Sequence, residues 1–255
     1  MLKTEDIYNQ RYQTGYRDHL SGYEIARWSA LKHFSAKTAK VSSAEKVLDY
    51  GSGSGLHVGL WKEIFFQSGL YFADISSVAL DKLKENFPEY QNNVCLIKDD
   101  KTHFDDNTFD VVVSIEVMEH VVDLPAYVKE IFRILKPGGK FIWTTPCGNK
   151  GSIEYFYSAR RKQIESTKEG YIRWKWEDPT HLRRLKSKEI EKVLLEIGYN
   201  KVFFRFRSHF FSFVCTKLQA KGMLSERWAN RLMLLDYKMF RVFSNAASMI
   251  GCATK

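Results

Sequence analysis

The stretch Asp49-Tyr50-Gly51-Ser52-Gly53-Ser54-Gly55 follows a short apolar run and precedes a segment of helical character. Residues 46–50 predict a buried strand, and residues 56–66 predict a helix. Glycines at such a turn let the backbone approach a ligand closely, and the helix N-terminus offers unpaired N–H groups to a carboxylate or phosphate. The spacing G-x-G-x-G is one residue tighter than the dinucleotide fingerprint. The stretch predicts a nucleotide-type site, with a plain glycine-rich turn as the alternative.

Strands and helices alternate after this stretch. Strands are expected at residues 70–73, 94–97, 109–114 and 140–144, and helices at residues 78–87 and 124–135. The alternation predicts parallel βαβ units in an open, doubly wound α/β sheet. A helix at residues 187–197 precedes two further strands, at 201–206 and 210–215. The three residues between these strands are short enough for a hairpin.

Two segments flank a core that we predict to span residues 41–217, and a third is an insertion within that core. Residues 1–40 predict a helical lid, or an N-terminal helix that simply packs on the core. An insertion at about residues 148–180 is rich in aromatic and basic side chains. Residues 218–255 predict a C-terminal basic amphipathic helix that Ser225 can cap.

An apolar stripe at helical spacing runs along this tail, and basic residues accompany it. The stripe consists of Trp228, Leu232, Leu235, Met239 and Val242, and the basic residues are Arg227, Arg231, Lys238 and Arg241. Such a helix can lie on an anionic membrane surface. The alternative is that the stripe packs on the protein's own sheet or on a second subunit.

The net charge of +9 is distributed unevenly along the 255 residues. Residues 1–130 carry 14 Lys and Arg against 20 Asp and Glu, whereas residues 131–255 carry 25 against 10. The basic half indicates an anionic partner or a solvated basic face. The four cysteines are scattered, no apolar stretch reaches the length of a membrane span, and the N-terminus has no signal-peptide core. We therefore expect a cytoplasmic protein, with contact at the membrane periphery as an option.

Asp74 ends the second predicted strand, 23 residues after Gly51. A carboxylate at this position can accept both hydroxyls of a ribose. A solvated aspartate at a strand end is the alternative, but the glycine loop nearby favours the ribose role.

Four blocks together resemble the class I S-adenosylmethionine-dependent methyltransferases. The blocks are residues 46–55, 104–121, 133–140 and 178–183, in the order of that family, and they cover roughly residues 40–200. The likeness is to small-molecule members, similar to bacterial methyltransferases of glycan or quinone pathways. It implies a seven-stranded, mostly parallel sheet of order 3-2-1-4-5-7-6 whose last strand is antiparallel, and S-adenosylmethionine as the cofactor.

The resemblance also implies which residues hold the cofactor. They are Asp49, Gly51, Ser52, Gly53 and Gly55 at the methionine end, Asp74 and Ile75 after the second strand, Asp99 or Asp100 at the adenine amino group, and Ser114, Ile115 and Glu116 near the sulfonium. The protein must mainly align nucleophile, methyl group and sulfur, since the donor is already activated.

A hydroxyl acceptor would also use a general base, and His120 and His181 are the candidates. Each could instead be a structural histidine that bonds to backbone. A sharper alternative joins Glu116, Glu119, His120 and His181 in a site for a divalent metal, similar to the pattern of small-RNA 2′-O-methyltransferases and ubiquinone-pathway O-methyltransferases. We expect no metal, because the same block occurs in relatives for which none is inferred.

The leading hypothesis is methyl transfer to a hydroxyl of a small-molecule, sugar or lipid-linked acceptor. An RNA-modifying methyltransferase is less favoured, since no separate RNA-binding module is present in the sequence. A non-catalytic relative that only binds the cofactor is the third class, because a fold alone does not imply turnover.

Overall fold

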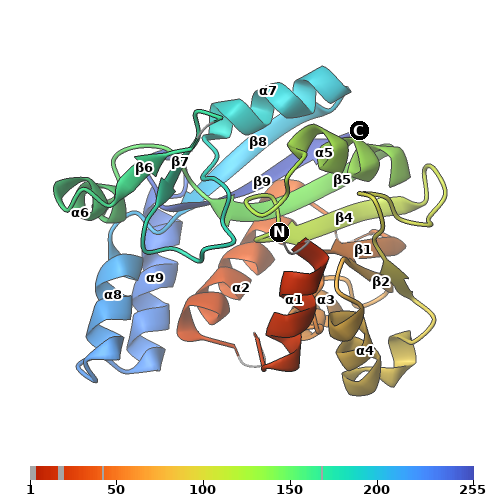
Figure 1. Ribbon diagram of the computed structural model, residues 1–255, viewed down its shortest axis with the longest axis horizontal. Coiled ribbons are helices and arrows are strands. Elements are labelled where there is room, and N and C mark those ends of the chain that lie inside the picture. Colours follow the sequence, from red (N-terminus) through yellow and green to blue (C-terminus); the bar gives the residue numbers. More distant parts are fainter. Residues whose placement is uncertain (1–3, 17–19, 42, 168) are drawn as a thin grey trace.

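The computed structural model describes residues 4–16, 20–41, 43–167 and 169–255. Within these residues the main sheet has seven strands in the order β3-β2-β1-β4-β5-β9-β8 (Figure 1). The strands are β1 (Lys46–Tyr50), β2 (Gly69–Asp74), β3 (Val94–Leu96), β4 (Phe109–Ile115), β5 (Leu135–Pro146), β8 (Asn200–Arg207) and β9 (Ser248–Thr254). The first five are mutually parallel, and β9 runs antiparallel to both β5 and β8. The predicted strand order is confirmed.

Helices cover both faces of this sheet (Figure 1). On one face lie α5 (Leu124–Ile134) and α7 (Ser187–Ile197); on the other lie α2 (Gly22–Phe34), α3 (Val58–Ile64) and α4 (Ser77–Asn86). Strand β4 is buried on both sides: Val112 joins one core cluster, and Val111 and Val113 join the other. This alternation is what a central strand of a two-sided α/β sheet requires.

The predicted strand at residues 210–215 is wrong, because residues 211–215 lie in helix α8 (Phe211–Ala220) and Phe210 directly precedes it. The Asp236 carboxylate accepts hydrogen bonds from the backbone N–H groups of residues 209–211, and so satisfies donors at the start of the helix. Local propensity for a strand is outweighed by these tertiary contacts.

The C-terminal segment is correspondingly more than the single helix predicted for residues 218–255. Helix α9 (Glu226–Phe240) occupies its middle, but Ser248–Thr254 forms β9 in the interior of the sheet. A Cβ atom at Gly251 would lie 2.1 Å from the Trp143 ring, so the strand fits beside β5 only with a glycine there. Strand β9 is not predicted from the sequence, because it contains few of the β-branched and aromatic residues that are typical of strands.

Two segments stand at the margins of the sheet. The insertion forms α6 (Ile153–Arg160) and a two-stranded antiparallel sheet of β6 (Ile164–Ser166) and β7 (Ile172–Trp174). At the N-terminus, α1 (Thr4–Gln13) lies in front of the edge where the parallel strands end (Figure 1). Residues 1–3 and 17–19 of the predicted lid lie outside the described residues.

Candidate active site

The glycine loop leaves β1 in a conformation that only glycine adopts without strain. Gly51 and Gly53 have φ values of +83° and +55°. A Cβ atom would lie 2.3 Å from Val117 Cγ2 at Gly51, and 2.3 Å from the Tyr12 hydroxyl at Gly53. The loop is therefore enclosed between the turn after β4 and helix α1, and its glycines keep that space open.

Asp74 fixes this loop from the end of the neighbouring strand. Its Oδ2 accepts a hydrogen bond from the Gly53 N–H at 2.8 Å, and its Oδ1 accepts one from the Ser76 N–H at 2.9 Å. An ionised carboxylate has about four lone-pair positions, so it can accept more than two hydrogen bonds. The carboxyl ends of parallel strands meet at one edge, which is why the two motifs converge.

A cavity of about 470 Å³, here called the first cavity, opens at this edge. Its volume is in the range of small-molecule cofactor sites. The predicted site residues that line it are Gly51, Asp74, Ile75, Asp99, Asp100, Glu116 and His120. Three tyrosines from the N-terminal segment, Tyr8, Tyr12 and Tyr16, line it too. Seven predicted site residues thus lie at one cavity, and the N-terminal segment lies against it.

The other predicted cofactor residues do not line this cavity; they are Asp49, Ser52, Gly53, Gly55, Ser114 and Ile115. Ser114 Oγ donates to the Tyr50 carbonyl and accepts from the Tyr127 hydroxyl. Asp49 accepts a 2.6 Å hydrogen bond from the Trp61 ring N–H, while its other oxygen is buried without a hydrogen-bond partner among the described residues. Burial and the charge of Asp74 raise the pKa of Asp49 to about 7.

Side chains of helix α1 contact two segments beside the first cavity, the start of α4 and the loop at residues 178–180. The Asn9 side chain accepts a hydrogen bond from Ser76 Oγ at 2.7 Å, which ties α1 to the start of α4. Arg11 forms an ion pair with Asp178 and donates to Thr180 Oγ1 at 3.0 Å. Burial would raise the pKa of Asp178, but the bonds from Arg11 and Thr180 outweigh it and hold that pKa well below its usual range.

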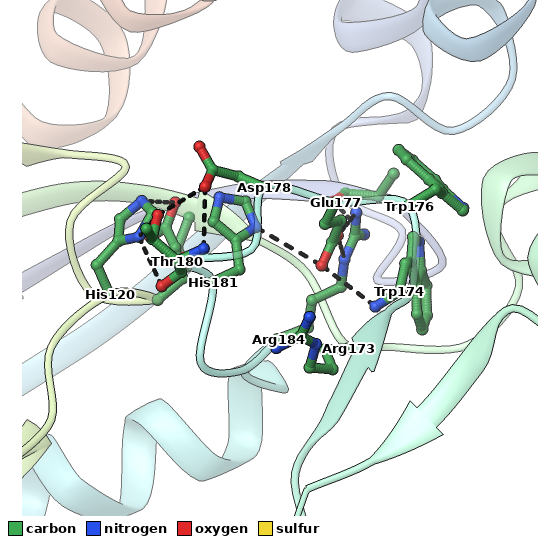
Figure 2. A network of polar contacts seen from close by, with 12 residues as sticks. His120, Arg173, Trp174, Trp176, Glu177, Asp178, Thr180, His181 and Arg184 are labelled. Atoms are coloured by element: carbon green, nitrogen blue, oxygen red, sulfur yellow. Dashed lines mark hydrogen bonds and ion pairs between the residues drawn. The ribbon is translucent and has the colours of Figure 1, made fainter. Parts of the chain in front are cut away.

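His120 and His181 meet where the first cavity borders the loop after the insertion. Figure 2 shows the two imidazoles side by side, and their ring centroids are 4.7 Å apart. His120 Nδ1 lies 3.1 Å from the Thr180 carbonyl oxygen and 3.2 Å from Thr180 Oγ1, and its Nε2 lies 4.0 Å from Glu119 Oε1. A carbonyl oxygen only accepts, so this contact favours the tautomer with its proton on Nδ1 and a basic Nε2. Burial lowers the pKa of His181, but the Glu177 carboxylate at 3.6 Å and the charge of Glu119 outweigh it, so that the pKa is raised.

The four residues of the predicted metal set are only partly brought together. Ligand atoms of Glu119, His120 and His181 lie within 4.8 Å of one another. Glu119 Oε1 is buried without a hydrogen-bond partner in the described part of the chain, and burial together with the charge of Glu116 raises the Glu119 pKa. Glu116 is engaged elsewhere, since it accepts from Thr144 at 2.8 Å and pairs with Arg27 at 3.1 Å. Three of the four side chains could hold an ion.

A second cavity of about 670 Å³ lies beyond the histidine pair. His181 lines it together with aromatic side chains from α2, the insertion and α8, namely Tyr23, Tyr157, Trp176 and Phe213. The buried Arg184 also lines this cavity. It pairs with Glu154 at 2.7 Å and with Glu177 (Figure 2). Thus two of the cavity's acidic groups already share one cation.

Two further cations line the second cavity without such a partner. Arg161 Cζ and Lys217 Nζ lie 4.6 and 4.8 Å from the Tyr157 ring centroid. Neither forms an ion pair with any residue that the structure describes. The cavity therefore combines aromatic surfaces with free positive charge.

Arg27 is the site residue that the sequence reasoning missed. It is buried on α2, pairs with Glu116, and lies 5.2 Å from the Tyr23 ring. A signal was present, because Arg27 falls at helical spacing with the apolar residues Ala30, Leu31 and Phe34. A cation on a buried helical face needs a partner in the interior.

A family described as a methyltransferase domain matches residues 18–202 of the chain. Among curated proteins, the sterol 24-C-methyltransferase of Aspergillus fumigatus is 36% identical over 121 residues, which are 43% of this chain and 30% of that protein. A ubiquinone/menaquinone biosynthesis C-methyltransferase of Haemophilus ducreyi is 32% identical over 116 residues, which are 44% of this chain and 45% of that protein. The chain spans less than half the length of these relatives.

A solved structure is similar over the whole chain. Phosphoethanolamine N-methyltransferase 2 of Haemonchus contortus, in complex with phosphomonomethylethanolamine and S-adenosylhomocysteine, has a TM-score of 0.64 at 16% identity. The match covers 100% of this chain and 60% of that one. At this identity the likeness shows a shared fold.

Proposed function

The chain belongs to class I of the S-adenosylmethionine-dependent methyltransferases, and we propose that it methylates a hydroxyl of a small molecule bound in the second cavity. The observation that carries this proposal is the contact between His120, which lines the first cavity, and His181, which lines the second. A donor in one cavity and an acceptor in the other would react where these two rings meet.

The first cavity fits the donor. Its glycine loop would receive the methionine end, because side chains are excluded there at Gly51 and Gly53. The Asp74 carboxylate would accept the ribose hydroxyls, and Asp99 or Asp100 the adenine amino group. When bound, S-adenosylmethionine supplies a methyl group already activated by positive sulfur. The residues of the chain then need to bind and orient the donor and the acceptor and to exclude water. Helix α1 would act as the lid that excludes water from the first cavity.

His120 is proposed as the general base. Its Nδ1 proton is directed at the Thr180 carbonyl oxygen, so Nε2 can take the proton of an acceptor hydroxyl. His181 is proposed as its cationic neighbour, because Glu177 and Glu119 favour its protonated form. A divalent ion on Glu119, His120 and His181 is the alternative; it would polarise the acceptor oxygen in place of proton removal by His120.

The lining of the second cavity supports an acceptor with a flat or ring-shaped body and an anionic group. Tyr157, Trp176 and Phe213 offer surfaces for a sugar or an aromatic ring. Arg161 and Lys217 would receive a phosphate or carboxylate. Sugars, quinone-type rings and lipid-linked intermediates remain the candidate classes.

The test is to incubate the protein with methyl-labelled S-adenosylmethionine and a cell extract, and to identify the labelled product by mass spectrometry. We expect a methyl ether on a small molecule. A label on carbon would overturn the hydroxyl assignment in favour of C-methylation, which the names of the two curated relatives favour. A label only on RNA would exclude a small acceptor. Loss of transfer on adding a chelator would favour the metal site over His120 as general base.

A further inference from the structure

Most of the predicted apolar stripe of α9 faces solvent, whereas Leu232 is half-buried and packs against the cluster between α9, α2 and α8. Trp228, Leu235 and Met239 are 56%, 44% and 56% exposed, and Val242 and Phe243 after the helix are 62% and 55% exposed. Large side chains gathered at this spacing along one helix form a continuous surface, whereas isolated exposed apolar residues are ordinary. Soluble proteins rarely leave such a surface without a partner.

The opposite face of α9 already has its packing partners. Ala229 and Met233 are buried in a cluster with Ala26 of α2 and Cys215 of α8. Tyr237 is buried in the core beside the sheet. The exposed stripe is therefore not needed to attach α9 to the protein, and the prediction that it packs on the protein's own sheet does not hold for these side chains.

One flank of the stripe is basic. Arg227, Arg231 and Lys238 are exposed, and at 3.6 residues per turn they fall on the same side of the apolar residues. Arg231 also lies over the Trp228 ring at 5.0 Å. Of the two acids on α9, Asp236 is buried and bonded to the start of α8, which leaves Glu226 in the first turn as the acid near solvent.

We propose that this face of α9 docks on the surface of an anionic lipid bilayer. An apolar stripe beside cations matches an interface in which acyl chains lie below negative headgroups. A second copy of the chain that pairs antiparallel through α9 fits less well, because a two-fold axis across the helices would set the basic flanks against each other. Docking would be peripheral, since no helix of the described residues is long and apolar enough to cross a membrane.

Docking would also place the second cavity close to the lipid. Helix α8 packs beside α9, and it contributes Phe213 and Lys217 to the lining of that cavity. An acceptor that carries a lipid tail would then reach the cavity from the same surface.

The experiment is co-sedimentation of the full chain with vesicles of phosphatidylcholine alone or mixed with phosphatidylglycerol. We expect the protein to pellet only with the mixed vesicles, and less so at high salt. R227Q/K238Q should lower partitioning about thirtyfold, at about 1 kcal/mol per cation. Leu235→Gln should lower it by roughly tenfold, since a leucine no longer enters the interface. The emission of Trp228 should shift to shorter wavelength on mixed vesicles, and Trp228→Phe should remove that shift.

The matched controls lie on α7, which the proposal leaves in solvent. Leu195 is 54% exposed, and Lys188 and Lys192 are exposed, so Leu195→Gln and K188Q/K192Q make the same chemical changes elsewhere. Both should bind vesicles like the wild type. Equal losses in the controls, or a wild type that stays in the supernatant, would overturn the proposal. So would a concentration-dependent dimer that Leu235→Gln dissociates while vesicles remain unbound.

Discussion

The two cavities differ in how the chain builds them. The first cavity is formed by the ends of neighbouring parallel strands, and each strand end follows a short apolar run in the sequence. The second is formed by α2, the insertion and α8, which are far apart along the chain and are joined only by tertiary packing. A site fixed by sheet topology can be located from motifs, whereas a site between packed helices cannot.

The largest effect is expected at the glycine loop beside the first cavity. Gly53→Val should abolish binding of S-adenosylhomocysteine in calorimetric titration, because the new Cβ would lie 2.3 Å from the Tyr12 hydroxyl. Gly170→Val is the matched control, since Gly170 also has a positive φ of +84° but nothing within 4 Å of its Cβ position. If both variants bind alike, the glycine loop does not hold the cofactor.

The junction of the two cavities should show the next largest effect. His120→Gln is expected to lower turnover by about 10²–10⁴-fold, because the acceptor hydroxyl loses its base, while the affinity for S-adenosylhomocysteine stays unchanged. His103→Gln, at an exposed histidine, is the control. An unchanged turnover in His120→Gln would mean that positioning alone is enough.

Asp49, a buried acid near the end of β1 beside the glycine loop, should make the free energy of unfolding depend on pH. The pKa of Asp49 is raised to about 7 by burial, so the folded state favours the protonated form. Its contribution to the free energy of unfolding is therefore fully present below pH 4 and is lost as the pH rises, by about 3 kcal/mol between pH 4 and pH 7. Asp49→Asn should flatten this part of a denaturation series without ligand. The same slope in both proteins would contradict a raised pKa.

These two regions also show where the sequence was informative. The glycine loop, Asp74 and the turn after β4 could be placed together, because the carboxyl ends of parallel strands meet at one edge of the sheet. Strand β9 could not be predicted, since Ser248–Thr254 has few β-branched residues and is defined by how Gly251 fits against Trp143. Helix α8 was mistaken for a strand because its N-terminal donors are satisfied by Asp236, far along the chain.

A ribose-binding carboxylate should contribute less than the base. Asp74→Ala is expected to weaken binding of S-adenosylmethionine by about 1–3 kcal/mol, the scale of hydrogen bonds to a charged group. Part of this loss would come from the glycine loop, since Gly53 N–H loses its acceptor. Asp81→Ala, at an exposed aspartate on α4, should bind like the wild type. Wild-type affinity in Asp74→Ala would remove Asp74 from the site.

The smallest effect concerns the second cavity, where the sequence is least informative. R161A/K217A should weaken binding of phenyl phosphate by roughly tenfold, because two exposed cations contribute modestly to binding an anion. The probe can be followed by fluorescence, since Trp176 lines the same cavity. The control R160A/K221A removes two exposed cations that do not line it. Benzoate and phenol in place of phenyl phosphate separate a preference for phosphate, for any anion, or for the ring alone. Equal weakening in the two double variants would mean that the basic half attracts anions without a site. In that case the two cavities would differ in function as well as in construction, because the second would lack the charge selectivity that the proposal gives it.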